Sequence, residues 1–429
     1  MDITVTDLER HRRNTRLYER LLFSVRSQIL IGVSLGFWLQ LMMGTGLDGF
    51  WSNMTRESIG LIVASVLVYW LSITTVYRLS RFPGTKAYLF ILPAITLSFA
   101  IALLILKMIG LELTRSSLAL SYMTIVTYCL VEYAIDVRLR RLRLAVLPHG
   151  RAPALCQHSG VDWQLLQCPD LGQARVDGVV ADLRADFPAE WKRFLANCTI
   201  HGVPVYHATS AHEMITGRVP LDYLYENEYG SLTPQEDYAL IKRGLDTIAV
   251  IALSPLLLPA MVLIALVIRL DSPGSAIFTQ LRMGYHCRPF IVYKFRSMYV
   301  DSEGKGFTEL DCDPRITRVG RVIRKYRLDE LPQLFNVLRG EMSLIGPRPE
   351  SMMLTDVYER DVPFFHYRHL VRPGISGWAQ VEQGYAVERD GMIRKLEYDF
   401  YYIKHFSFWL DVLIVLRTIK ILVTGFGAR

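Results

Sequence analysis

The densest cluster of polar residues in the chain, residues 318–350, contains two adjacent carboxylates, Asp329 and Glu330. A carboxylate can attack phosphorus and form an acyl-phosphate intermediate. A second carboxylate can hold Mg²⁺, which neutralises the charge of a diphosphate. Basic side chains steer and bind phosphates, and five of them precede the pair: Arg318, Arg321, Arg324, Lys325 and Arg327. These residue types are the ones that phosphoryl transfer requires.

A proline indicates how the two carboxylates are placed. Pro332 is costly inside a helix but tolerated in its first turn, where the backbone N–H groups lack partners. The spacing therefore predicts a helix that begins at about Leu328–Asp329 and continues through the apolar run 331–338. Both carboxylates would lie at the positive end of this helix, which also favours phosphate. A simpler interpretation is that Asp329 caps the helix and Glu330 interacts with its dipole, and spacing alone favours it.

Five short motifs occur in order around the pair: residues 293–298, 313–320, 328–334, 342–349 and 372–377. Together they resemble the bacterial sugar transferases, which are monotopic polyprenyl-phosphate phosphoglycosyl transferases. The resemblance covers the chain from about residue 240 to its end. The N-terminal third and the segment after it look like those of the larger members, which prime exopolysaccharide, capsule or O-antigen synthesis with a hexose 1-phosphate.

The resemblance implies a role for each matching residue. The nucleophile falls on Asp329, and the neighbouring Glu330 assists it and binds Mg²⁺. The other implied contacts are with substrate: Lys294 and Arg324 near the phosphates, Pro347, Arg348 and Pro349 on the nucleotide, and Asp399 in a late Tyr-Asp-x-Tyr-Tyr segment.

The implied reaction transfers a sugar 1-phosphate from a UDP-sugar to polyprenyl phosphate, here undecaprenyl phosphate, and releases UMP. It passes through a phosphosugar-aspartate intermediate. One departure from the family concerns the sugar. Many relatives have Asn-Gly-Arg after an Ala-Gln-Val run, whereas residues 382–384 of this chain are Glu-Gln-Gly. The identity of the sugar therefore stays open.

Four apolar stretches fill the first third of the chain, at residues 27–43, 58–77, 87–106 and 116–135. Each has about the 20 residues that a helix needs to cross a bilayer. Basic residues gather before the first stretch, between the second and third, and after the fourth, which places both ends of the bundle in the cytoplasm. The sequence therefore predicts a four-span transmembrane bundle over residues 1–137. The alternative is a soluble bundle of four buried helices.

The segment 138–235 has the pattern of a small α/β domain. Residues 144–147, 178–181 and 203–206 are predicted strands, and residues 189–196 a helix between two of them. No Gly-x-Gly-x-x-Gly follows the first strand, where residues 148–151 are Pro-His-Gly-Arg. We interpret this Rossmann-like domain as a structural or assembly module; a cofactor site is the alternative.

A fifth apolar stretch, residues 248–268, contains Pro255 and Pro259 near its middle and has basic residues on both flanks. Proline bends a helix, and the charges give no reason for the chain to cross the membrane. These residues fit either a re-entrant helix, about 244–270, or an ordinary kinked span. Ser254 could cap the break. The resemblance favours the re-entrant form, because a Ser-Pro break in that helix matches Ser254–Pro255.

Composition agrees with a membrane protein, because 51% of the residues are hydrophobic and the mean hydropathy is positive. The net charge of +7 comes from basic residues beside apolar runs, which indicates a membrane surface rather than nucleic acid. The six cysteines show no CxxC pair or zinc spacing, which fits a reduced cytoplasmic setting. The charged first twenty residues lack a cleavable signal peptide.

The predicted fold class is a membrane α-helical bundle, then an α/β domain, then an α-rich monotopic catalytic domain with a re-entrant membrane helix. This catalytic domain, residues 236–429, would end in an amphipathic interfacial helix, 406–425, whose basic residues reach lipid headgroups. The predicted location is the bacterial inner membrane, multi-pass, with catalysis on the cytoplasmic face. A sugar-lipid transporter and a catalytically silent scaffold are the rival functions. The polysaccharide pathway and a homo-oligomeric state are open.

Overall fold

The computed structural model describes residues 56–85, 88–110, 115–139, 142–172, 174–221, 232–300, 313–383 and 389–424, with a few positions between 27 and 34. The chain forms two compact units, Met1–Thr216 and Gly217–Arg429. The three domains proposed from the sequence, with boundaries at residues 137 and 235, stay predictions.

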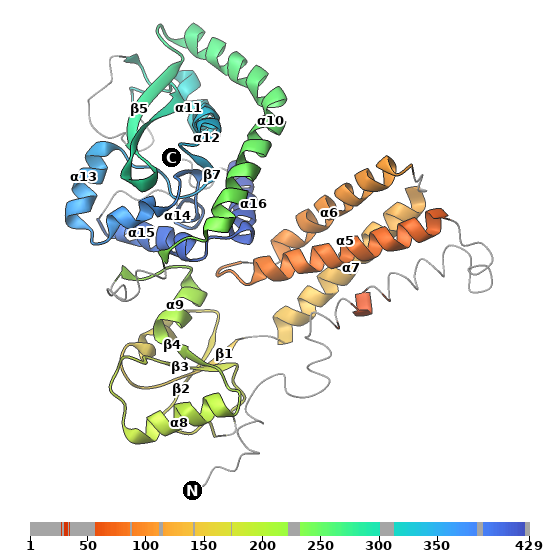
Figure 1. The fold of residues 1–429 in the computed structure, drawn as a ribbon, viewed down its shortest axis with the longest axis vertical. Helices are drawn as coiled ribbons and strands as arrows, with labels where there is room; N and C mark the ends of the chain where they lie inside the picture. Colours follow the sequence, from red (N-terminus) through yellow and green to blue (C-terminus); the bar gives the residue numbers. More distant parts are fainter. Residues whose placement is uncertain are drawn as a thin grey trace. The chain divides into compact units, whose positions relative to one another are not determined.

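Three apolar helices open the described part of the first unit: α5 (Arg56–Ser80), α6 (Tyr88–Met108) and α7 (Arg115–Leu139). They cover the second, third and fourth predicted spans, whereas the first, residues 27–43, falls almost wholly outside the described residues. The three helices pack side by side through a shared apolar core that includes Tyr69, Ile91, Ile95 and Ile125 (Figure 1). By length and apolarity, Leu89–Met108 in α6 and Leu118–Ile135 in α7 could cross a membrane.

A four-stranded parallel sheet forms the second part of this unit, in the order β2-β1-β3-β4. Its strands are β1 (Arg143–Val146), β2 (Asp162–Leu165), β3 (Gly178–Ala181) and β4 (Val205–His207). Around it lie η1 (Ala152–Gln157), α8 (Ala189–Ile200) and α9 (Ala208–Thr216). The α/β domain and its three predicted strands are confirmed. Strand β2 was not predicted, because it is a largely exposed edge strand with the polar sequence Asp-Trp-Gln-Leu.

A carboxylate of the protein itself lies at the carboxyl edge of this sheet. Asp182, after β3, accepts hydrogen bonds from the backbone N–H of Arg151 (3.0 Å) and of Arg184 (3.3 Å). Gly150 has φ +64°, and a Cβ there would lie 2.5 Å from Asp182 Oδ2. In dinucleotide-binding folds this first strand-to-helix turn holds a phosphate. The contact supports the prediction of a structural module, since Asp182 takes the backbone donor that a phosphate would use.

The second unit opens with α10 (Glu236–Asp271), a helix of 36 residues that is also long and apolar enough to cross a membrane. The helix is continuous through Pro255 and Pro259, so the predicted break between two helices was wrong, and α10 is instead bent along its length (Figure 1). Pro255 has no N–H for the carbonyl of Ile251, four residues before it. The Ser254 hydroxyl donates to that carbonyl instead, at 2.7 Å. Ser254 therefore satisfies the acceptor that the proline leaves open.

Both halves of α10 pack against the second unit. Val250, in the first half, joins a core with Val292 and Val337. Ile268, in the second half, joins a core with Phe295 and Ile323. The rest of the helix exposes large apolar side chains: Leu240, Ile241, Leu245, Ile248, Ile251, Leu253, Leu256, Leu258, Val262, Leu263, Leu266, Val267 and Leu270. One side of α10 is thus bound to the protein and the other is apolar and uncovered.

The remaining elements of the second unit surround two small sheets. An antiparallel hairpin joins β5 (Ile277–Met283) to β6 (Pro289–Phe295) through η4 (Tyr285–Cys287), and β7 (Ser343–Ile345) pairs in parallel with β8 (Gly374–Ser376). The helices are α11 (Arg318–Lys325), η6 (Leu328–Glu330), α12 (Gln333–Arg339), α13 (Met352–Asp361), η7 (Phe365–Leu370), α14 (Trp378–Glu382), α15 (Arg389–Lys404) and α16 (Phe408–Thr424). The unit is therefore helix-rich.

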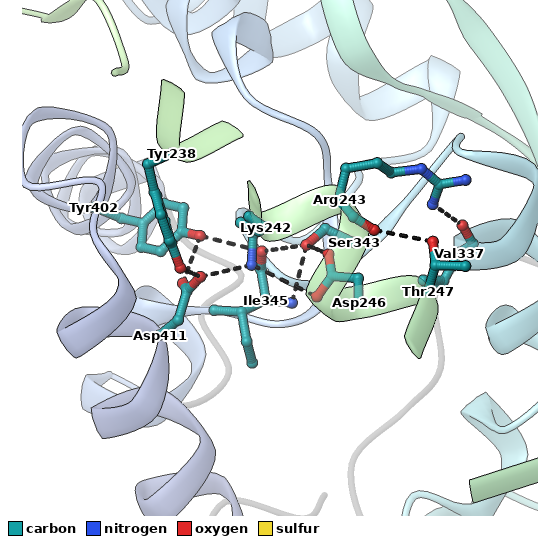
Figure 2. A network of polar contacts seen from close by, with 10 residues as sticks. All are labelled: Tyr238, Lys242, Arg243, Asp246, Thr247, Val337, Ser343, Ile345, Tyr402 and Asp411. Atoms are coloured by element: carbon teal, nitrogen blue, oxygen red, sulfur yellow. Dashed lines mark hydrogen bonds and ion pairs between the residues drawn. The ribbon is translucent and has the colours of Figure 1, made fainter. Parts of the chain in front are cut away.

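A buried polar network joins α10 to three other elements (Figure 2). Asp411 of α16 pairs with Lys242 of α10 at 2.7 Å and accepts from Tyr402 of α15 at 2.8 Å. Asp246, one turn after Lys242, accepts from the Ser343 hydroxyl of β7 at 2.6 Å. Removing one partner of a buried pair would leave an uncompensated charge, so these contacts attach the first turns of α10 to β7, α15 and α16.

The C-terminal helix α16 differs from its predicted role in one respect. Arg417 does not extend toward lipid headgroups, because its guanidinium forms an ion pair with Glu382 and lies 4.8 Å from the centre of the Trp378 ring. An arginine can satisfy a carboxylate and an aromatic face together. Lys420 is exposed, and the exposed surface of α16 also carries an apolar stripe of Phe408, Val415, Ile419 and Leu422.

Candidate active site

The two carboxylates lie in η6, a single 3₁₀ turn between α11 and α12. Arg327, just before them, has a left-handed backbone (φ 53°), and the N–H of Leu331 closes the turn on the Leu328 carbonyl at 3.2 Å. Helix α12 begins only at Gln333, after Pro332. The predicted helix start at Leu328–Asp329 was therefore wrong by one turn. The i→i+3 bonds of this turn place the carboxylates ahead of the helix rather than in its first turn.

Glu330 is the buried member of the pair, only 5% exposed. Its Oε1 accepts a hydrogen bond from Arg348 Nη2 at 2.6 Å, and Lys294 Nζ lies 4.0 Å away. Burial opposes ionisation of this carboxyl, but Arg348 and Lys294 outweigh it and lower its pKa to about 2. Glu330 is therefore a stable anion, and it in turn raises the pKa of Arg348.

Asp329 has a different environment from its neighbour. Burial raises its pKa, as does the Glu330 carboxylate, while Lys294, Arg348 and Arg324 act in the opposite direction. No residue in the described part of the chain makes a hydrogen bond or ion pair with its side chain. A carboxylate without hydrogen-bond donors keeps its basicity, which is the property that a nucleophile needs.

The basic residues in α11 and just after it do not all interact with the carboxylate pair. Arg324 is close enough to stabilise the Asp329 anion, and Arg327 interacts with both carboxylates. By contrast, Arg318, Arg321 and Lys325 are exposed. Only part of the predicted cluster therefore belongs to the site.

Two further cations reach the site from the β5–β6 hairpin. Burial lowers the pKa of Lys294 to about 7, with Arg282 and Arg348 adding to the shift. Arg282 and Lys294 occupy the same face of the hairpin, because Arg282 pairs with Phe290 and Phe278 pairs with Lys294. Arg282 was not predicted as a site residue; the alternation of the two strands could have identified it once their register was known.

The structure brings five of the predicted site residues together, namely Asp329, Glu330, Lys294, Arg324 and Arg348. Ser254 and Pro255 lie inside α10, where the Ser254 hydroxyl binds the Ile251 carbonyl rather than a residue of the site. Asp399 is 1% exposed and its ion-pair partner is Arg368 at 2.8 Å. It does not contact the carboxylate pair directly, and burial raises its pKa.

An open groove of about 410 Å³ is lined by Tyr293, Phe335, Leu338 and Arg339. Tyr293 and Lys294 are neighbours on one strand, so their side chains leave the hairpin on opposite faces. The groove is therefore separate from the carboxylate site, and its four lining residues include no carboxylate.

A buried histidine predicts a pH effect on stability. His369 is 5% exposed, and burial, together with Arg368 and His366, lowers its pKa to about 3 against the opposing Glu350. Between pH 6.5 and 3 the unfolded chain binds this proton and the folded protein does not, so stability falls as the pH falls. We expect His369→Phe to reduce the loss of unfolding free energy between pH 7 and pH 5 by about 2 kcal/mol.

The measurement is thermal unfolding of the wild type and the variant in the same detergent at both pH values. Phenylalanine keeps the ring-edge contact that His369 makes with Phe365. An equal loss of stability in the two proteins would show that His369 does not titrate on unfolding in this range.

The chain is similar to known proteins along its whole length. The sequence model of the family described as bacterial sugar transferase matches residues 237–425. A UDP-N-acetylgalactosamine-undecaprenyl-phosphate N-acetylgalactosaminephosphotransferase of Aeromonas hydrophila is 47% identical over 421 residues, which cover 97% of this chain and 99% of that protein.

Two other relatives match a shorter region. An undecaprenyl-phosphate glucose phosphotransferase of Komagataeibacter xylinus is 46% identical over 197 residues, 42% of this chain and 35% of that protein. A UDP-glucose:undecaprenyl-phosphate glucose-1-phosphate transferase of Caulobacter vibrioides is 41% identical over 198 residues, 46% of this chain and 74% of that protein. The similarity to the Aeromonas protein therefore extends beyond the part that these two relatives share with the chain.

Proposed function

The chain belongs to the bacterial sugar transferase family and is a transferase, and from this premise we propose that it moves a sugar 1-phosphate from a UDP-sugar to undecaprenyl phosphate. The observation that carries the proposal is the carboxylate pair. Asp329, which has no hydrogen-bond or ion-pair partner among the described residues, lies beside an ionised Glu330, with Lys294, Arg324 and Arg348 around them. A nucleophile among cations suits attack on a diphosphate.

The reaction has two balanced steps. The Asp329 carboxylate attacks the β-phosphorus of the UDP-sugar, and the bond from that phosphorus to the bridging oxygen breaks, so UMP leaves with the bonding electrons. A phosphate oxygen of undecaprenyl phosphate then attacks the same phosphorus. The bond to Asp329 breaks, which restores the carboxylate and yields an undecaprenyl-diphosphate sugar.

The residues of the site fit a Mg²⁺ ion that enters bound to the substrate rather than one held by the protein alone. The described residues contain no group of three or more His, Cys, Asp and Glu side chains that could hold a metal ion. Mg²⁺ usually binds one or two carboxylates together with substrate phosphates and water, and Glu330 supplies such a carboxylate. When bound, the ion would neutralise diphosphate charge. Arg348 keeps Glu330 ionised for this role, and Lys294 and Arg324 bind the phosphates.

N-acetylgalactosamine is the sugar that we propose for the donor. The Aeromonas relative named for this sugar matches almost the whole chain, whereas the two glucose transferases match less than half of it. The test is Mg²⁺-dependent UMP release from purified protein in nanodiscs with undecaprenyl phosphate and a panel of UDP-hexoses and UDP-N-acetylhexosamines. UMP release with UDP-glucose alone would refute the sugar assignment, and no release with any donor would favour a scaffold or a transporter.

The chain is a membrane protein, and we place it in the inner membrane with several spans and its catalytic unit on the cytoplasmic face. Its reaction would be the first step of exopolysaccharide, capsule or O-antigen biosynthesis. A re-entrant α10 explains how a cytoplasmic nucleotide and a lipid headgroup meet at one depth. The packing of Val250 and Ile268 against one unit supports it, because a spanning helix would have its two ends on opposite sides of the membrane.

Cysteine labelling tests the re-entrant helix. We expect Gln235→Cys and Thr279→Cys, at exposed positions on either side of α10, to react with an impermeant maleimide from the cytoplasmic side only. The background carries serine at Cys156, Cys168, Cys287 and Cys312, and only the buried Cys129 and Cys198 stay. Ile109→Cys, between two predicted spans and 68% exposed, is the matched control and should react only from the opposite side. Labelling of positions 235 and 279 from different sides would show that α10 crosses the membrane.

A further inference from the structure

The segment Pro347–Arg348–Pro349 is held in place by its carbonyl groups. Prolines have no N–H to donate, so two of the three residues cannot anchor the chain through an amide. Each carbonyl instead accepts a hydrogen bond from a donor elsewhere in the unit. Pro347 accepts from the Gly374 N–H at 2.9 Å, Arg348 from the Arg368 guanidinium at 2.8 Å, and Pro349 from the Arg282 guanidinium.

Arg368 is the donor at the centre of this arrangement, and it is 2% exposed. The same nitrogen that binds the Arg348 carbonyl lies 2.8 Å from Asp399 Oδ2, and its other terminal nitrogen lies 3.5 Å from Glu350 Oε1. Lys395 forms a close ion pair with Glu350. Two cations and two anions thus form a neutral buried cluster behind the segment.

Such a cluster is a poor source of stability, because the desolvation of buried charges offsets much of their attraction. Its geometry indicates another role. The carbonyl that Arg368 binds belongs to Arg348, whose own guanidinium donates to Glu330 at 2.6 Å. A shift of the main chain at Arg348 would therefore move its side chain relative to Glu330.

We propose that Arg368 is a positioning residue that acts on the reaction through Arg348, and that Asp399 is its counter-ion rather than a contact of the substrate. This inference rests on the proposed function of the Asp329–Glu330 site. It assigns a role to a buried arginine outside the matching motifs, and it changes the role that the sequence implied for Asp399.

A double-mutant cycle separates positioning from general stability. Arg368→Met is expected to lower kcat for UMP release about 100-fold, the size of effect that a displacement near 1 Å can have. In an Arg348→Gln background, the same Arg368→Met change should alter kcat less than about twofold, because Arg368 acts on the reaction only through Arg348. Radiolabelled UDP-N-acetylgalactosamine allows kcat to be measured for slow variants. The affinity for the same donor, measured by calorimetry, gives a second double-mutant cycle that does not require turnover.

Two further variants complete the experiment. Asp399→Asn should lower kcat in the same direction as Arg368→Met, and the two should also be non-additive. Arg218→Met is the matched control, because Arg218 pairs at 3.5 Å with Glu397 on the same helix as Asp399 but touches neither Arg348 nor Arg368. It should leave UMP release unchanged. Asp399→Asn keeps a near-isosteric side chain, so it tests the proposal if Arg368→Met does not fold.

Additive effects of Arg368→Met and Arg348→Gln would overturn the proposal, as would unchanged UMP release by Arg368→Met and Asp399→Asn. If UMP release by these variants falls only in step with their Tm, the buried cluster is merely structural and the proposal is overturned. If the wild type releases no UMP with any donor, the proposed function itself fails. If the wild type is active and Arg348→Gln has no effect, Arg348 is not the route, and the positioning role alone is refuted.

Discussion

Asp329→Asn is expected to lower UMP release by about 10⁴-fold or more, the scale of loss when an enzyme's nucleophile is removed. The amide is neutral and a poor nucleophile, yet it has nearly the same size and shape as the carboxylate. Asp329 has no hydrogen-bond or ion-pair partner among the described residues, so the fold should be little affected. The measurement is UMP release with donor, lipid phosphate and Mg²⁺ all present, alongside Tm.

A covalent intermediate offers a second measurement of the same assignment. With the donor but no lipid acceptor, intact-protein mass spectrometry of the wild type should show an added phosphosugar, and Asp329→Asn should not. Asp356→Asn, at an exposed position of α13, is the matched control and should behave as the wild type does. Full UMP release by Asp329→Asn with both substrates present would refute the assignment of the nucleophile.

Glu330→Gln is expected to have the second largest effect, and it should act on both stability and metal dependence. The glutamine cannot neutralise Arg348, which lies 2.6 Å away, or Lys294 at 4.0 Å. A buried cation without its partner costs roughly 3–5 kcal/mol, so Tm should fall. The Mg²⁺ concentration for half-maximal UMP release should rise about tenfold or more, the range seen when support for a bound metal is lost.

Measurements of Tm and of Mg²⁺ dependence distinguish the structural role of Glu330 from its role as a metal ligand. An unchanged Tm in Glu330→Gln would mean that its pairing with Arg348 does not stabilise the fold. An unchanged Mg²⁺ dependence, with reduced activity, would remove Glu330 as a metal ligand. Glu341→Gln is the control for loss of a carboxylate in the same unit, because Glu341 accepts from Asn336 at 2.7 Å, away from the site cations.

The helices and strands could be predicted from the sequence where local signals were strong. Long apolar runs placed α6, α7 and α10, and short β-branched or aliphatic runs placed β1, β3 and β4. Signals of a few residues were less reliable. Pro332 marked a helix start, but the left-handed Arg327 and the 3₁₀ turn after it moved that start to Gln333. Local spacing cannot distinguish an i→i+3 turn from the first turn of an α-helix.

The candidate site could be predicted only in part. Asp329, Glu330 and Arg348 lie in motifs with a recognisable order, and the structure brings their charges together. Arg282 and Arg368 were missed because each acts on a carbonyl group more than a dozen residues away in the chain. No local pattern marks such a donor.

The sequence by itself determined the family, the apolar helices and the residue types that could perform phosphoryl transfer, because each is encoded in contiguous or regularly spaced residues. Tertiary structure alone decided which charges meet. Arg417 forms an ion pair with Glu382, and Asp399 forms one with Arg368. Lys242 pairs with Asp411, which lies 169 residues away in the chain. A buried charge must be paired wherever packing places a partner. Which partner a charge meets depends on long-range packing. Packing therefore distinguishes Glu330, which is paired with Arg348, from Asp329, which has no such partner in the part of the chain that the structure describes.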